Sequence, residues 1–103
     1  MAHIRPVEIM SHAEILRGIG ERARRYRLDQ LNWSQETLQQ RSGVAVSTIK
    51  RFEKTGKITL DNLILIATAM QAASPLLQLF ELQPVESIAE LEQRTRQRQR
   101  GTR

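Results

Sequence analysis

The stretch that decides the fold of this chain is QETLQQRSGVAVSTIKRFE, residues 35–53. Gln35 to Ser42 has the length of a two-turn helix, and Ser34 in front of it is a residue type that caps helix N-termini. Gly43 then suits the left-handed conformation that often ends a helix. A second helix is expected over about Ala45 to Lys54. The pattern therefore predicts two short helices joined by a tight turn.

The side chains of these two helices divide into an inward and an outward set. The inward set is apolar and can pin the helices together; it contains Leu38, Val44, Ile49 and Phe52. The outward set on the second helix contains Val46, Ser47, Lys50 and Arg51. These outward side chains are long enough, or close enough to the helix start, to reach base edges in the major groove of DNA. An ordinary solvated helix face is the alternative interpretation.

Groups suited to phosphate lie around the same stretch. From Arg41 to Lys57 there are five cations and one acid. Gln35 is at the positive, N-terminal end of its helix, where backbone N–H groups favour an anion. The predicted phosphate-binding residues are Gln35, Arg41, Thr48, Lys54 and Lys57.

Capping signals divide the rest of the chain into further helices. The capping box Ser11-His12-Ala13-Glu14 opens a helix that is expected to reach about Leu28. Thr59 caps an apolar helix over about Leu60 to Met70, whose expected core residues are Leu63, Ile64, Ile66, Ala67 and Met70. The chain is thus predicted to be an all-α bundle.

The C-terminal part also contains helix starts. Ser74-Pro75 pairs an N-cap with a proline at the first helical position, and opens a short helix to about Leu82. Ser87-Ile88-Ala89-Glu90 is a further capping box, and its polar helix decays into an arginine-rich end. The expected organisation is an N-terminal leader over residues 1–10, a helical domain over residues 11–82, and a basic helix or tail over residues 83–103.

Composition limits the class of protein. With 103 residues, 40% hydrophobic and 26% charged, the chain resembles one small globular domain rather than a disordered protein. The apolar run from Leu63 to Met70 is too short to span a membrane. The absence of cysteine excludes disulfides and thiolate metal sites, and favours a reducing, cytoplasmic compartment. The net charge of +5 favours a polyanionic partner.

Over about residues 12–82 the sequence resembles the lambda-repressor-like (Cro/CI or Xre) helix-turn-helix family of DNA-binding domains. The matching residues are Ile19-Gly20-Glu21-Arg22, Ser34-Gln35-Glu36, Leu38, Gly43-Val44, Ser47-Thr48-Ile49, Arg51, Glu53, Gly56, Leu60, Leu63, Ile66-Ala67 and Ala69-Met70. The resemblance implies a five-helix fold and a base-reading role for Val46, Ser47, Lys50 and Arg51. It also implies that Gln35 holds a phosphate and that Glu53 pairs with an arginine of the first helix, here Arg27.

Three positions depart from this family. Gln39 stands where the family usually has alanine, at a close approach of two helices, so its stem must be accommodated. Ala45 replaces the usual serine or threonine cap, which forfeits about 1 kcal/mol. The connection between the first two helices is one residue longer than is usual in the family, which weakens the assignment of Arg27 as the arginine that pairs with Glu53.

The resemblance and the composition together predict a sequence-specific transcriptional regulator, a repressor, that binds an operator as a homodimer. The expected dimer surface consists of Leu76, Leu77, Phe80 and Leu82, which are more apolar than a small domain's exterior usually permits. Trp33 is expected to be a packing anchor. No cofactor, metal site or membrane partner is expected, and no motif indicates an enzyme.

Several alternatives stay open. The segment Ser74–Phe80, the segment Ser87–Leu91 and the Arg/Gln-rich end also resemble HipB-like antitoxins, which would add a toxin protein as a partner. A protein–protein adaptor on the same fold is a further alternative. Residues 1–10 are consistent with a leader or with an edge strand exchanged across a dimer. The arginine-rich end is either a solubilising tail or a segment lying along DNA phosphates.

Overall fold

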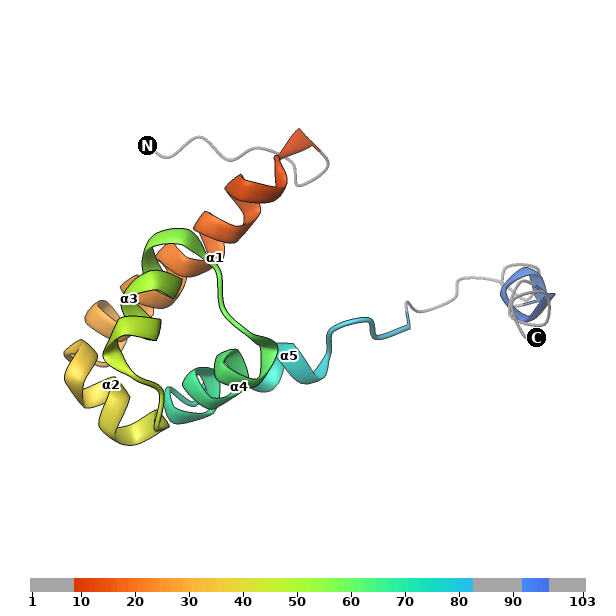
Figure 1. Ribbon diagram of the computed structural model, residues 1–103. Helices are drawn as coiled ribbons and strands as arrows, with labels where there is room; N and C mark the ends of the chain where they lie inside the picture. Colours follow the sequence, from red (N-terminus) through yellow and green to blue (C-terminus); the bar gives the residue numbers. More distant parts are fainter. Residues whose placement is uncertain (1–8, 83–91, 97–103) are drawn as a thin grey trace.

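The computed structural model describes residues 9–82 and 92–96, and within these ranges all regular structure is helical (Figure 1). The elements in chain order are α1 (His12–Arg25), a π-helical turn η2 (Tyr26–Gln30), α2 (Gln35–Ser42), α3 (Val46–Thr55), α4 (Leu60–Ala69) and α5 (Ser74–Leu77). The all-α prediction is confirmed for these residues. The expectations for residues 1–8, the Ser87 capping box and the last seven residues lie outside the described part of the chain.

The capping box predicted at the start of α1 is present. The Ser11 hydroxyl accepts a hydrogen bond from the Glu14 N–H at 3.1 Å, and the Glu14 carboxylate accepts from the Ser11 N–H at 3.3 Å. The predicted end at Leu28 was wrong, because α1 ends at Arg25 and continues as η2. In η2 the Leu31 N–H donates to the Tyr26 carbonyl at 3.3 Å. This wider turn takes in one residue more than an α-helical turn.

The turn between α2 and α3 forms as predicted. Ser34 caps α2 by accepting from the Thr37 N–H at 3.0 Å, and Gly43 ends it with a φ of 78°. A side chain at this φ would be strained, so glycine is the residue type that the turn requires. Helix α3 begins at Val46, with Ala45 as its N-cap residue, and ends at Thr55, one residue beyond the predicted end.

The core lies where α2, α3 and α4 meet. Leu38, Val44, Ile49 and Phe52 are buried, as predicted, together with Ile66 and Met70 from α4. Trp33 packs against this cluster from the connection before α2, which confirms its role as an anchor. Ile64 was expected in the core but is 44% exposed, because α4 covers the core with only one of its faces.

Helix α1 lies directly against α3. Gly20, at the contact, is buried, and a Cβ atom there would overlap the Phe52 carbonyl oxygen. The missing side chain therefore permits the two helix backbones to approach closely. Through this contact α1 supports α3 from the side opposite to α4 (Figure 1).

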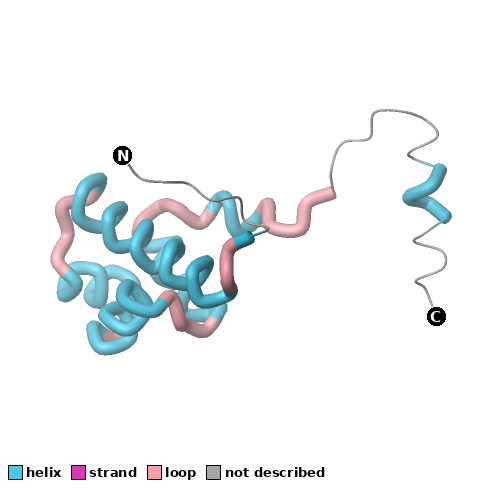
Figure 2. Tube along the Cα trace, turned by 90° about the horizontal axis from the view of Figure 1, so that it is seen from above, coloured by secondary structure: helices cyan, strands magenta, loops and turns pink. Residues whose placement is uncertain are grey.

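Helix α5 is shorter than predicted. It ends at Leu77 rather than at about Leu82, and residues 78–82 leave the helical body as a turn and an extended segment (Figure 2). The Gln78 N–H donates to the Pro75 carbonyl at 3.2 Å in a tighter, i to i+3 pattern, and Phe80 has a left-handed φ of 66°. A residue in that conformation cannot continue an α-helix. None of the described helices has the length and apolar character needed to cross a membrane.

Candidate nucleic-acid interface

Helix α3 presents a polar, cationic face away from the core. Ser47, Lys50, Arg51 and Lys54 are exposed, whereas Ile49, Phe52 and Glu53 are buried on the opposite face. Val46 and Thr48 are half-buried at the edges of the exposed face. The four predicted base-reading residues thus lie on the first two turns of α3, three of them fully at the surface.

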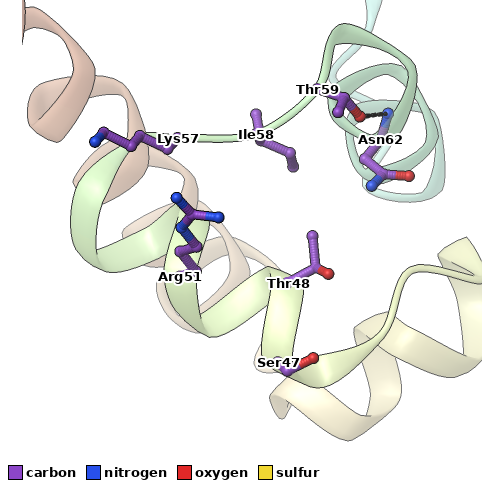
Figure 3. Close-up of a pocket in the computed structure, with 7 residues that line it drawn as sticks. All are labelled: Ser47, Thr48, Arg51, Lys57, Ile58, Thr59 and Asn62. Carbon is purple, nitrogen blue, oxygen red and sulfur yellow. Dashed lines mark hydrogen bonds between the residues drawn. The ribbon is translucent and has the colours of Figure 1, made fainter.

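A first hollow, of about 510 Å³, lies between α3 and α4 (Figure 3). It is lined by Ser47, Thr48 and Arg51 from α3, by Lys57 and Ile58 from the connection, and by Thr59 and Asn62 at the start of α4. Figure 3 shows the Arg51 and Thr48 side chains directed towards the connection and α4. Two predicted base-reading residues and two predicted phosphate-binding residues therefore share one concave surface.

A second hollow, of about 380 Å³, lies where α3 meets α1 and the start of α2. Its lining residues are Glu21, Arg24, Gln35, Lys50, Glu53 and Lys54. The predicted residues Lys50, Lys54 and Gln35 are thus brought together here. The two hollows divide the predicted interface between two sides of α3.

Two polar residues at these hollows were missed by the sequence analysis. Asn62 lines the first hollow, and its N–H is held by the Thr59 hydroxyl at 3.2 Å in the cap of α4. Arg24 lines the second hollow, with its guanidinium 3.9 Å from the Glu21 carboxylate. No local pattern marks either residue, since each reaches α3 only through the packing of another helix against it.

A buried ion pair fixes α3 relative to η2. Arg27 Nε donates to Glu53 Oε2 at 2.7 Å and Arg27 Nη2 donates to Glu53 Oε1 at 2.9 Å, which is a bidentate pair. Arg27 Nη1 also donates to the Trp33 carbonyl at 2.8 Å. The pairing of Arg27 with Glu53 expected from the family is confirmed. Since Arg27 compensates the Glu53 charge, the exposed cations of α3 face no free carboxylate on their own helix.

Gln35 belongs to the same network. Its side-chain Nε2 donates one of its two amide hydrogens to Glu53 Oε1 at 3.0 Å, and this bond holds the amide beside α3. The groups at this position that suit an anion are the N–H groups of the first turn of α2. The phosphate-binding role of Gln35 stays a prediction.

Arg41 lies apart from both hollows. Its guanidinium carbon is 4.8 Å from the centroid of the Trp33 ring, in a cation–π contact. Arg41 is exposed in the last turn of α2. Arg41 therefore extends the cationic surface beyond α3, and its phosphate contact stays a prediction.

The comparison with protein families agrees with this geometry. The model of the helix-turn-helix family matches residues 24–75, just over half of the chain. The chain belongs to the Cro/CI- and Xre-type helix-turn-helix family. The matched segment runs from the end of α1 to the start of α5, and so contains the turn, both of its helices and α4. Among curated proteins, none matches the sequence.

Membership of the helix-turn-helix family assigns the general role of the surface. The family consists of DNA-binding regulator domains rather than enzymes. Within residues 9–82 and 92–96 no three His, Asp or Glu side chains are grouped as metal ligands.

Proposed function

We propose that this helix-turn-helix protein is a sequence-specific transcriptional repressor that occupies an operator in double-stranded DNA. The observation that carries the proposal is the uncovered cationic face of α3, flanked on both sides by polar hollows. No other part of the described chain shields that face. In helix-turn-helix proteins the second helix of the motif enters the major groove, and α3 is that helix here.

The two hollows fit the way a helix lies in DNA. A helix in the major groove lies between two phosphate backbones, in a groove about 12 Å wide. One backbone would contact Thr48 and Lys57, and the other would contact Lys54 and the first turn of α2. The side chains of Val46, Ser47, Lys50 and Arg51 then point at base edges, where arginine and lysine select guanine. Phosphate contacts set the register, and base contacts set the sequence.

The repressor is proposed to act as a homodimer. A single small module buries too little surface for tight specific binding, so two copies on a near-palindrome, about 34 Å or a multiple apart, are expected. Leu77, Phe80 and Leu82 support this proposal, because they are 88%, 94% and 83% exposed. Leu76 is half-buried, and Leu79 adds a further exposed apolar residue.

Selection of bound duplexes from a random library, followed by titration of two variants, tests the proposal. Arg51→Ala is expected to weaken operator binding by about 1–3 kcal/mol and to relax the preference at one base position. Lys57→Ala is the matched control at the same hollow: it is expected to weaken all duplexes alike and to reduce the salt slope by about one. An equal loss on operator and random DNA in Arg51→Ala would refute base reading by this residue.

An antitoxin that also represses its own promoter is the second candidate. The apolar segment 77–82 is the observation that favours it, because such a surface also fits a partner protein of another kind. Native mass measurement after co-expression with the neighbouring gene product separates the two functions. A homodimer that takes up no second protein indicates the plain repressor.

A further inference from the structure

The N-terminus of α3 lacks a cap from its own N-cap residue. Ala45 occupies that position, and a methyl group cannot accept a hydrogen bond. The first N–H groups of any helix have no partner inside the helix. Without another acceptor, the Val46 N–H would depend on water.

A side chain of the preceding helix supplies the acceptor. Gln39 Oε1, from α2, accepts a hydrogen bond from the Val46 N–H at 2.7 Å. The Gln39 main-chain carbonyl also accepts from the Gly43 N–H at 2.8 Å. One residue therefore holds both ends of the connection between the two helices, at Gly43 and at Val46. The glutamine at position 39 therefore supports the first turn of α3, at a different N–H from the one that a serine at position 45 would hold.

This contact lies where the proposed reading of DNA begins. Val46 and Ser47 are the first two residues of α3 and the proposed base-reading residues nearest to its end. A frayed first turn would spread these side chains over several orientations, and only a fraction of them would fit the groove. Apparent affinity for a given sequence falls in proportion to that fraction.

We propose that Gln39 is a positioning residue for sequence recognition: it caps α3 from α2 and fixes the orientation of Val46 and Ser47 at the bases. The proposal rests on the proposed function, since it concerns how the same helix reads DNA. Gln39 acts through the backbone of α3, and its amide needs no contact with DNA.

The test compares Gln39→Met, which keeps the length of the side chain and removes the oxygen, with Gln40→Met. Gln40 is the neighbouring exposed glutamine of α2 and makes no side-chain hydrogen bond in the described part of the chain, which makes it a matched control. A third variant, Gln39→Met with Ala45→Ser, returns a cap to α3 from its own N-cap position. Each protein is titrated with the selected operator and with random duplex, and hydrogen exchange of the Val46, Ser47 and Thr48 amides is followed in the free protein.

Gln39→Met is expected to lower the ratio of operator to random affinity by about threefold to tenfold and to speed Val46 exchange. Gln40→Met is expected to change neither, and the added Ala45→Ser, whose hydroxyl can accept from the Ser47 or Thr48 N–H, is expected to protect those amides and to restore the preference for operator. Slow exchange of the core amides shows that each variant is folded.

Other outcomes separate the proposals. A wild-type protein without sequence preference overturns the proposed function itself. A wild-type preference that survives unchanged in Gln39→Met, or an equal loss on all duplexes, overturns the positioning role alone. Protected Ser47 and Thr48 amides without restored preference in the double variant also overturn it, because an ordered first turn of α3 would then be insufficient for recognition.

Discussion

The orientation of α3 depends on the buried carboxylate of Glu53. Both of its oxygens accept hydrogen bonds from Arg27, and Oε1 also accepts one from Gln35. A buried ion pair adds little net stability compared with apolar residues of equal size, but removal of one partner leaves an uncompensated charge. The network therefore specifies one arrangement of η2, α2 and α3 rather than simply strengthening the fold.

Replacement of Glu53 by leucine should be strongly destabilising. Arg27 would keep its charge while buried, so a loss of about 3–5 kcal/mol in the free energy of unfolding is expected. The double variant Arg27→Met with Glu53→Leu should recover most of that loss, because it buries no charge. Urea unfolding of the two proteins measures both values. A single-variant loss below about 1 kcal/mol would show that Arg27 reaches solvent after the change.

Gln39 and Ala45 show what single positions can and cannot predict. Each departs from its family, and each by itself indicates a defect: an oversized side chain in one case and a missing cap in the other. The 2.7 Å hydrogen bond from the Val46 N–H to Gln39 Oε1 connects the two positions, because Gln39 supplies an acceptor beside the residue that has none. The prediction of a lost cap was therefore incomplete, because the replacement acceptor comes from seven residues earlier in the chain.

Among the helices, the crossing of α1 over α3 controls how the recognition helix is supported. Gly20 is the point of closest approach, since a Cβ there would overlap the Phe52 carbonyl. Gly18 lies in the same helix, yet a Cβ there would meet nothing within 4 Å. Both glycines are therefore helical residues, but only at Gly20 would an added Cβ meet the neighbouring helix.

Alanine at these two positions should have opposite effects. Gly20→Ala forces α1 and α3 apart and is expected to lower the free energy of unfolding by about 1–3 kcal/mol. Gly18→Ala is the matched control and is expected to raise it by about 1 kcal/mol, because alanine favours the helix. Thermal and urea unfolding give both signs. Stabilisation by Gly20→Ala would contradict the close approach.

The ends of helices were the least predictable feature of the elements. Helix starts with Ser11, Ser34 and Thr59 follow from the side-chain caps that the structure contains. The π-helical turn after α1 and the stop of α5 at Leu77 carry no such signal. Both depend on whether a backbone N–H donates its hydrogen bond to the carbonyl three or five residues earlier instead of four. The packing of the helices decides between these patterns.

Across the protein as a whole, the cationic and the apolar surfaces belong to different elements. Exposed cations lie on α3 and the connection after it and also on α1, whereas the three most exposed apolar side chains, Leu77, Phe80 and Leu82, lie at the end of α5 and after it. This separation permits DNA and a second copy to be bound together.

Self-association should depend on the segment after α5. Phe80→Ser is expected to shift the protein from dimer to monomer, because it removes the most exposed aromatic side chain of the proposed interface. Leu28→Ser is the matched control, since Leu28 is an apolar residue that is 39% exposed in η2, far along the chain from that segment. Sedimentation velocity measures both. A Phe80→Ser protein that remains dimeric would exclude this surface.

Reading along the chain was sufficient to identify the helices, the turn at Gly43, the buried apolar positions of α2 and α3, and the family. Caps, turn glycines and helical periodicity are local features, so they can be recognised in the sequence before the fold is known. The cap that Gln39 gives to α3, the engagement of Gln35 with Glu53, and the division of the cationic side chains between two hollows were decided only by tertiary structure. These features join different helices, and such contacts exist only once the helices pack. The pair of Arg27 and Glu53, for example, spans 26 positions of the sequence.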